Sequence, residues 1–362
     1  MLKFFCPKCG KICEEVRRPV SCGCGSPLKS SLDWASFDID PSAVGMWRYS
    51  RILPEIDPSI SMGEGWTPLI TGGSKNLFYK LEYVSPTGSF KDRGSVIVMG
   101  EAKSLGCDEV VQDSSGNAGA SIAAYAARSG IKATVIVPND TPELKKRQIE
   151  LFGATLVVAE GGRSSAASIA KEMARTMFYA SHVWNPLFLE GTRTIAFEIW
   201  EQLGGKAPDV VIVPAGNGTI LLGIFKGFME LLQRVKINRL PRIIAVQGVN
   251  CAPLFAAWKG SHSWDTFQTT VAEGIAVSDP PRMKEMLDAV RMSRGEVVIV
   301  SNGAILAEEK RLALEGGLLV EPTSAAAPAA ERMLRESGAI TDREIVVVPL
   351  TGTGLKKFPK KA

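Results

Sequence analysis

A single lysine stands in a short glycine- and serine-rich stretch, GSFKDRGS, which covers residues 88–95. Lys91 follows Phe90, and we expect it to lie where a loop becomes a helix. A lysine at a helix start is ordinarily a solvated charge. A lysine enclosed by small and aromatic residues can instead lose its proton and attack a carbonyl carbon to form a Schiff base. In that case Asp92 and Arg93 would pair and fix the loop.

Three turns rich in glycine, serine and threonine follow runs of β-branched residues and could bind ligands. PAGNGT (214–219) precedes the apolar run ILLGIFKGFMELL, so its N–H groups and the helix start suit a phosphate monoester. SSGNAG (114–119) offers hydroxyl, amide and helix-start N–H donors to a carboxylate. TGTG (351–354) offers a neutral hydroxyl. Each can also be an ordinary turn without a ligand, and PAGNGT lacks the Lys-Ser/Thr ending of a nucleotide-binding P-loop.

Five of the seven cysteines fall within the first 24 residues, and their spacing suits a metal ion. CPKC supplies Cys6 and Cys9, and CGCG supplies Cys22 and Cys24, a pattern typical of a zinc ribbon with four thiolates around one Zn²⁺. The second pair is one residue tighter than usual, so Cys13 could replace one ligand. Unmetallated thiols are the alternative. A site closed by four protein ligands would be structural.

The chain after the cysteines alternates short β-branched runs with segments of helical length, which predicts parallel sheets covered by helices on both faces. One helical segment, residues 117–130, ends on a glycine typical of a C-cap. Ligands bind beyond the carboxyl ends of parallel strands, so the three turns point to one site, or to two sites on neighbouring sheets. The expected strands are 110–115, 133–138, 154–160, 209–216, 242–249, 296–301 and 343–352.

Composition limits the classes of protein that this chain can be. Apolar residues make up 45% and charged residues 22% of the 362 positions, which indicates a globular protein with a substantial core. The net charge of +4 is too small to indicate a nucleic-acid partner. No run of about 18 apolar residues could span a membrane. The N-terminus lacks a signal-peptide pattern, so we expect a cytoplasmic protein without nucleic-acid or membrane partners.

Taken in order, these motifs resemble those of the fold-type II pyridoxal-phosphate (PLP) enzymes, and within them the threonine synthases. The resemblance covers nearly the whole chain from about residue 60 onward. An N-terminal zinc-ribbon-like segment is common among archaeal and some bacterial members of that family. The matching segments are GEGWTPL (63–69), SPTGSFKDRG (85–94), SSGNAGAS (114–121), NP and LEGTRT within 185–194, PAGNGT (214–219), EPTSAA (321–326) and PLTGTGLK (349–356).

The resemblance also implies a domain organisation. A zinc-ribbon-like segment would cover residues 1–28. A large PLP-binding α/β domain would combine residues 30–94 with 191–362, and a small α/β domain, residues 95–190, would move when substrate binds. The cofactor would lie between the two domains, and the chain would form a homodimer.

The resemblance assigns roles to single residues. Lys91 would bind PLP covalently and act as general base, with Phe90 packed near the cofactor. Asn117 would hydrogen-bond the ring hydroxyl, and Thr351 the pyridine nitrogen. A neutral hydroxyl does not keep that nitrogen protonated, which favours elimination and replacement over transamination. The cofactor phosphate would be bound by Gly216, Asn217, Gly218 and Thr219. The substrate-binding residues would be Ser114, Ser115, Ala118, His182 and Arg193.

The resemblance implies a carbon–oxygen lyase that converts O-phospho-L-homoserine and water to L-threonine and phosphate. Threonine synthases usually carry an arginine for the substrate phosphate within NP-x-R-x-EG, where this chain has Phe188. A dianion without a guanidinium partner binds more weakly, so either Arg193, His182 or another residue compensates, or the substrate carries no phosphate. A threonine or serine dehydratase and a β-replacement enzyme therefore stay open. The non-enzymatic alternative is a binding protein that retains the fold, which the retained site residues argue against.

Overall fold

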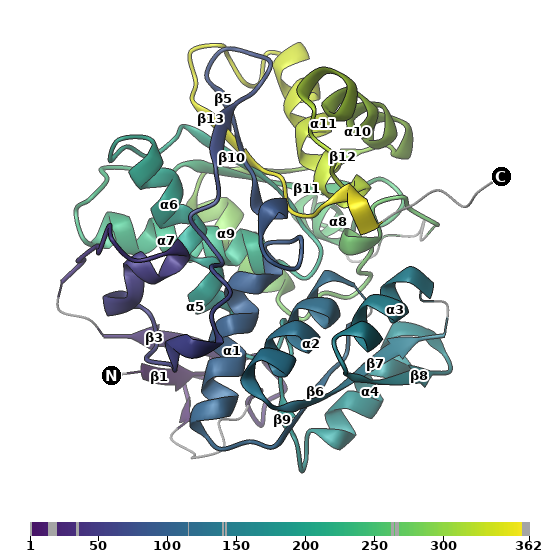
Figure 1. The fold of residues 1–362 in the computed structure, drawn as a ribbon. Coiled ribbons are helices and arrows are strands. Elements are labelled where there is room, and N and C mark those ends of the chain that lie inside the picture. Colours follow the sequence, from purple (N-terminus) through teal and green to yellow (C-terminus); the bar gives the residue numbers. More distant parts are fainter. Residues whose placement is uncertain are drawn as a thin grey trace. The chain divides into compact units, whose positions relative to one another are not determined.

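The computed structural model of the chain describes residues 2–13, 20–33, 36–114, 116–139, 141, 143–261, 264 and 268–356. The chain divides into two compact units (Figure 1). Unit 1 combines Met1–Gly65 with Ser85–Thr192, and unit 2 combines Trp66–Val84 with Arg193–Ala362. The sequence predicts a large domain that joins residues 30–94 with residues 191–362. This division stays a prediction.

Unit 1 is built on a four-stranded parallel sheet with the order β8-β7-β6-β9. The central strand β7 is apolar and buried along almost its whole length, as expected of a strand covered on both faces. Helices α2 and α3 pack on one face and α4 on the other (Figure 1). These elements are β6 (Glu109–Gln112), β7 (Lys132–Pro138), β8 (Thr155–Ala159), β9 (Phe178–Tyr179), α2 (Asn117–Ser129), α3 (Glu143–Leu151) and α4 (Gly162–Met173).

Helix α1 (Lys91–Ser104) packs against α2 and against the short helix α5 (Phe188–Thr192) in the same unit. The contact between α1 and α5 is close because glycines stand at two places. A Cβ atom on Gly191 would lie 1.8 Å from the carbonyl oxygen of Arg93. A Cβ atom on Gly94 would lie 2.4 Å from the ring of Phe188. The start of α1 and helix α5 therefore lie so close that neither glycine could carry a side chain.

The N-terminal part of unit 1 is a small antiparallel sheet with the order β2-β1-β3. Its strands are β1 (Leu2–Phe5), β2 (Ile12–Cys13) and β3 (Lys29–Leu32). The short 3₁₀ helices of the chain are η1 (Gly45–Ile52), η2 (Pro58–Ile60), η3 (Glu82–Val84), η4 (Glu273–Ile275) and η5 (Gly354–Lys356).

Unit 2 is built on a six-stranded sheet with the order β12-β11-β10-β13-β5-β4, in which only β4 runs antiparallel to its neighbour. Helices α10 and α11 pack on one face, and α6, α7 and α9 on the other (Figure 1). The strands are β4 (Leu69–Thr71), β5 (Leu77–Lys80), β10 (Val210–Pro214), β11 (Arg242–Gly248), β12 (Glu296–Val300) and β13 (Val346–Pro349). The helices are α6 (Thr194–Gln202), α7 (Thr219–Gln233), α8 (Pro253–Trp258), α9 (Met283–Met292), α10 (Asn302–Gly316) and α11 (Pro322–Glu336).

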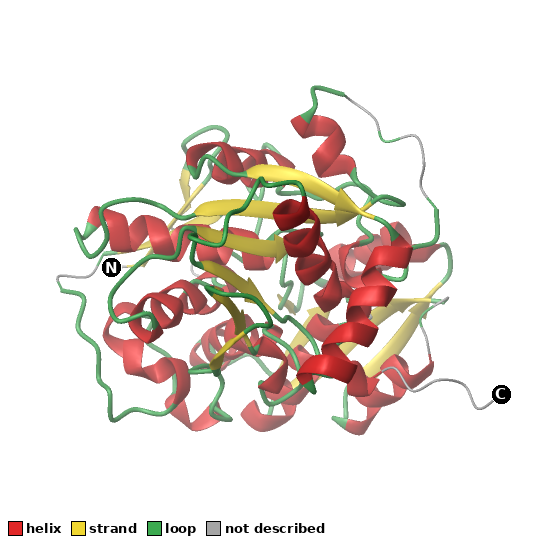
Figure 2. Cartoon of the chain, turned by 90° about the horizontal axis from the view of Figure 1, so that it is seen from above, coloured by secondary structure: helices red, strands yellow, loops and turns green. Residues whose placement is uncertain are grey.

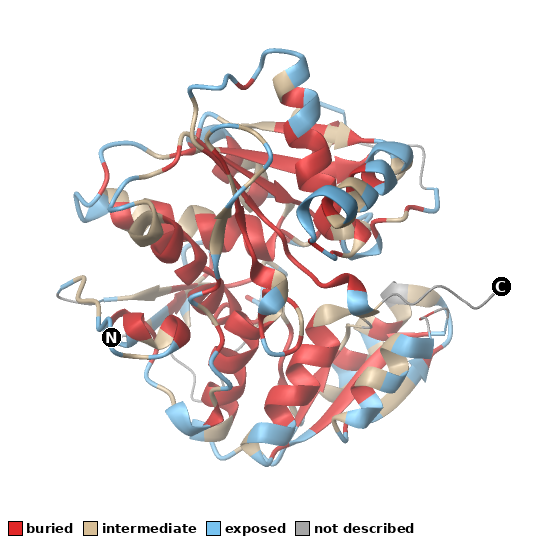
Figure 3. Ribbon diagram, turned by 45° about the horizontal axis from the view of Figure 1, so that its top comes forward, coloured by how far each residue is buried: buried red, intermediate tan, exposed pale blue. Residues whose placement is uncertain are grey.

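The predicted architecture of parallel sheets between helices is confirmed, and Figure 2 shows strands flanked by helices. Each of the seven expected strands corresponds to an observed strand, and α2 ends at Gly130 with a left-handed φ of 72°. Strand β7 of unit 1 and strands β10, β11 and β13 of unit 2 are almost completely buried (Figure 3). Six further strands, each two to four residues long, were not expected from the sequence: β1, β2, β3, β4, β5 and β9. In the part of the chain that the structure describes, no helix is both long and apolar enough to cross a membrane.

A buried ion pair connects β5 to α6 inside unit 2. The ammonium of Lys80 lies 2.6 Å from the carboxylate of Glu198, and both side chains are fully buried. Lys80 also donates to the carbonyl oxygen of Thr67 at 2.6 Å and to Gln202 at 2.9 Å. The carboxylate of Glu198 accepts the N–H groups of Trp66 and Thr67. Because each charge has several partners, the pair fixes the segment that enters the sheet at β4.

Replacing one member of this pair should destabilise the protein strongly. Lys80→Met leaves the Glu198 charge buried without its counterion, so we expect the free energy of unfolding to fall by about 3–5 kcal/mol. The control is Lys284→Met, which breaks an exposed i,i+4 pair with Asp288 and should cost less than about 1 kcal/mol. Urea unfolding followed by circular dichroism measures both. Equal losses in the two variants would contradict a structural role for the buried pair.

Candidate cofactor and zinc sites

Lys91 is the first residue of α1, and the loop before it is fixed by a buried carboxylate. Asp92 accepts hydrogen bonds from the N–H of Thr87 at 2.7 Å and from its hydroxyl at 2.6 Å. The hydroxyl of Ser121 on α2 donates to the same carboxylate at 2.6 Å. A carboxylate in the first turn of a helix is also favoured by the partial positive charge of the helix start. The backbone that carries Lys91 is thus held on both sides, while the proposed pairing of Asp92 with Arg93 stays a prediction.

The side chain of Lys91 lies beside two aromatic rings. Its Nζ atom is 4.6 Å from the ring centroid of Phe90 and 5.6 Å from that of Phe188. His182 stands edge-on to Phe188, with ring centroids 6.0 Å apart and an interplanar angle of 71°. Unit 1 therefore brings together Lys91, Phe90, Phe188 and His182, although the last two are about a hundred positions away in the sequence. Phe188 is completely buried, so the lysine side chain lies beside an apolar ring that is packed in the protein interior.

The SSGNAG turn lies at the carboxyl edge of the sheet of unit 1. It follows β6, and His182 follows the neighbouring parallel strand β9, so both reach the same edge. α2 begins at Asn117 directly after the turn. A Cβ atom on Gly119 would lie 1.9 Å from the carbonyl oxygen of Ser114, so this glycine lets the helix close onto the turn. Ala118 is buried, and Ser115 lies outside the described residues.

The PAGNGT and TGTG turns lie at the carboxyl edge of the sheet of unit 2. They follow β10 and β13, which are adjacent parallel strands. Gly218 has a left-handed φ of 82°, and α7 begins at the next residue, Thr219. A Cβ atom on Gly216 would lie 2.9 Å from the carbonyl oxygen of Gly274, so a side chain would crowd the turn. A glycine turn that runs directly into a helix start is an arrangement that suits an anion.

Thr351 carries an unsatisfied polar atom. Its Oγ1 is buried and has no hydrogen-bond partner among the residues that the structure describes. Its backbone N–H donates to the hydroxyl of Ser324 at 2.7 Å, which fixes the residue at the end of β13. A buried hydroxyl without a partner is costly, so the position fits a ligand heteroatom. Ser324 lies in the EPTSAA segment, to which the sequence analysis assigned no role.

Arg193 lies in unit 2 and has partners there. Its guanidinium is fully buried, pairs with Glu230 on α7 and lies 5.8 Å from the ring of Phe197. A Cβ atom on Gly227 would lie 2.4 Å from the carbonyl oxygen of Arg193, so α6 and α7 approach closely at this point. These contacts give Arg193 a structural role in the packing of the two helices. Its predicted contact with substrate stays a prediction.

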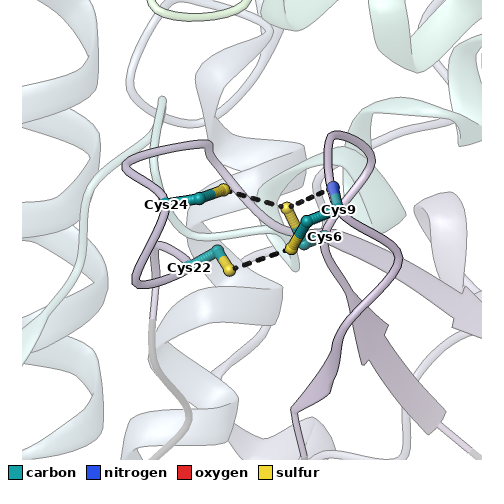
Figure 4. A group of neighbouring side chains, drawn as sticks. All are labelled: Cys6, Cys9, Cys22 and Cys24. Carbon is teal, nitrogen blue, oxygen red and sulfur yellow. Dashed lines mark hydrogen bonds between the residues drawn. The ribbon is translucent and has the colours of Figure 1, made fainter.

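The four predicted zinc ligands lie together beside the N-terminal sheet of β1, β2 and β3 (Figure 4). This sheet and the four cysteines together are called the ribbon. The Sγ atoms of Cys6, Cys9, Cys22 and Cys24 all lie within 4.8 Å of one another. Cys6 and Cys24 are 3.5 Å apart and Cys9 and Cys22 are 3.6 Å apart. Tetrahedral Zn²⁺ with bonds of about 2.3 Å needs sulfur atoms about 3.8 Å apart, so the arrangement fits one zinc ion. Cys13 packs against the cluster but is not part of this group.

The backbone around Cys6 favours its thiolate form. Burial of the thiol opposes ionisation, but the N–H groups of Cys9 and Lys8 point at the sulfur and lower the pKa of Cys6 to about 6. The thiolate is the form that binds metal ions. The tight Cys22-x-Cys24 pair still places its two sulfur atoms within 4.8 Å of those of Cys6 and Cys9.

The chain is similar to known pyridoxal-phosphate dependent enzymes. The family model for pyridoxal-phosphate dependent enzymes matches residues 60–352, and the chain belongs to that family. The threonine synthase of Methanocaldococcus jannaschii is 36% identical over 97% of this chain and 92% of its own. That of Methanosarcina acetivorans is 33% identical over 98% of this chain and 92% of its own. Maize serine racemase has a TM-score of 0.69 at 22% identity, covering 80% of this chain and 88% of its own.

Membership of this family confirms the predicted fold type and PLP as the cofactor. The residues present fit that cofactor. The unsatisfied hydroxyl of Thr351 suits the pyridine nitrogen, and the glycine turn that leads into the start of α7 suits the phosphate. Lys91, the first residue of α1, carries an amine of the kind that forms a Schiff base. The individual roles of these residues stay predictions.

Zinc should be bound by the four clustered cysteines and not by Cys13. We expect about one zinc ion per chain in the purified protein, and much less in Cys22→Ser, because three thiolates hold the ion more weakly than four. Cys13→Ser is the matched control and should keep its zinc. Inductively coupled plasma mass spectrometry measures the metal content. Equal zinc loss in both variants would show that Cys13 is a ligand, against the observed grouping.

Proposed function

We propose that the protein is a PLP-dependent lyase that converts O-phospho-L-homoserine and water to L-threonine and phosphate. The lyase class is supported by the buried hydroxyl of Thr351. In this proposal that hydroxyl is a neutral partner for the pyridine nitrogen. Such a partner favours elimination and replacement over transamination. The similarity to curated threonine synthases over nearly the whole chain supports the particular reaction.

In this proposal each site residue has a defined task. PLP supplies an electron sink for the carbanion that forms at the substrate Cα. Lys91 Nζ holds the cofactor before substrate binds, and afterwards takes the Cα proton and returns it. Asn117 donates to the ring hydroxyl, and the N–H groups of the turn from Gly216 to Thr219 bind the cofactor phosphate. Ser114 and the start of α2 bind the substrate carboxylate.

A second candidate is a threonine or serine dehydratase, which would give a 2-oxo acid and ammonia. Phe188 is the observation that favours it. Its buried ring lies 5.6 Å from Lys91 Nζ and offers no hydrogen-bond donor to a dianionic phosphate. In the first candidate His182, whose ring contacts Phe188, would donate to the substrate phosphate in place of a guanidinium.

Product analysis separates the two candidates. We expect the PLP-loaded protein to release phosphate and threonine in equal amounts from O-phospho-L-homoserine, because in this proposal Lys91 moves the Cα proton. Parallel reactions with L-threonine and L-serine are followed by 2-oxo acid formation, and Lys91→Ala is the blank. Oxo acid from threonine or serine, with O-phospho-L-homoserine inert, would make the second candidate correct. No reaction with any of the three substrates would contradict both.

A further inference from the structure

A buried hydrogen bond connects the ribbon to helix α5. Ser30 lies on β3, and its hydroxyl is 2.5 Å from the Oε1 atom of Glu190 and 3.1 Å from the carbonyl oxygen of Pro186. Ser30 is 7% exposed and Glu190 is completely buried. A buried carboxylate depends on its donors, so this contact holds β3 in a fixed place on α5. The two residues are 160 positions apart in the sequence.

Glu190 stands between the two points where α5 touches the start of α1. On one side, Phe188 occupies the space left by the missing side chain of Gly94 and lies 5.6 Å from Lys91 Nζ. On the other side, Gly191 lies directly against the carbonyl oxygen of Arg93. These contacts leave little room for α5 to shift without moving the first turn of α1. If Glu190 moves, α5 moves with it, and the first turn of α1, which carries Lys91, has to move as well.

The cysteine cluster fixes the other end of this connection. Ser30 pairs with Phe4 on β1, and Cys6 follows that strand directly. Leu28, two residues before Ser30, is completely buried against Cys6 and Cys22. The ribbon sheet is only two to four residues long per strand, too small to hold its own shape by apolar burial. The position of Ser30 thus depends on the cluster.

We propose that Ser30 and Glu190 are positioning residues through which zinc in the ribbon controls the placement of Lys91 and Phe188. With zinc bound, β3 is ordered and Ser30 donates to Glu190, so α5 keeps Phe188 against the lysine. Without zinc, the ribbon loosens and this hydrogen bond is lost. The inference rests on the proposed binding of PLP by Lys91.

The test compares the variants Ser30→Ala and Ser31→Ala. Ser31 is the next residue of the same strand and is less buried than Ser30. The readout is the visible circular dichroism of bound PLP, which reports the surroundings of the cofactor in the absence of substrate. In Ser30→Ala we expect this signal to change and kcat to fall about tenfold, with zinc content unchanged. Ser31→Ala should match the wild-type protein, and Ser30→Thr, which keeps the hydroxyl, should restore most of the signal.

Zinc removal provides the second arm. Chelation of the wild-type protein should change the PLP signal as Ser30→Ala does, and chelation of Ser30→Ala should add little, because both changes break the same connection. If Ser30→Ala does not fold, Glu190→Ala takes its place in both arms. An unchanged signal after zinc loss, or equal signals in the two serine variants, would overturn the inference. A wild-type protein that binds no PLP at Lys91 would instead overturn the proposed function on which it rests.

Discussion

The close contact between α5 and the first turn of α1 is the constraint on which the lysine site depends. Gly94 and Gly191 lack the side chains that would keep the two helices apart. The resulting separation puts Phe188 beside Lys91, while Asp92 anchors the same turn through Thr87 and Ser121. A reactive amine is useful only if its position is set before the substrate arrives. Here packing on one side and a buried carboxylate on the other set that position.

In unit 2 the sheet itself, and not helix packing, positions the residues that could bind the cofactor. Adjacent parallel strands end at one edge of its sheet, so the turn at Gly216 and Thr351 lie at the same edge. Backbone N–H groups and a helix start suit the phosphate of a cofactor, and an unsatisfied neutral hydroxyl suits a ring nitrogen. The ion pair of Lys80 and Glu198 contributes stability within the same unit and takes no part in this chemistry.

The sequence predicted the features that depend on neighbouring residues. Runs of β-branched residues gave the seven main strands, and the three turns were found because glycines follow those runs directly. The ligand spacing of the cysteines predicted their grouping, including the tight pair at Cys22. The sequence showed that Phe188 replaces an expected arginine, but not that its ring lies beside Phe90 and Lys91. That arrangement and the Ser30–Glu190 bond join distant segments, and no local pattern encodes them.

The central claim is that Lys91 holds PLP, with its position fixed by α5 and Asp92. The most direct measurement is to reduce the PLP-loaded protein with borohydride, digest it, and locate the modified peptide by mass spectrometry. The account predicts that the cofactor is found on Lys91 in the GSFKDRGS segment and on no other lysine. Cofactor bound to a different lysine, or a protein that retains no PLP after reconstitution, would contradict it.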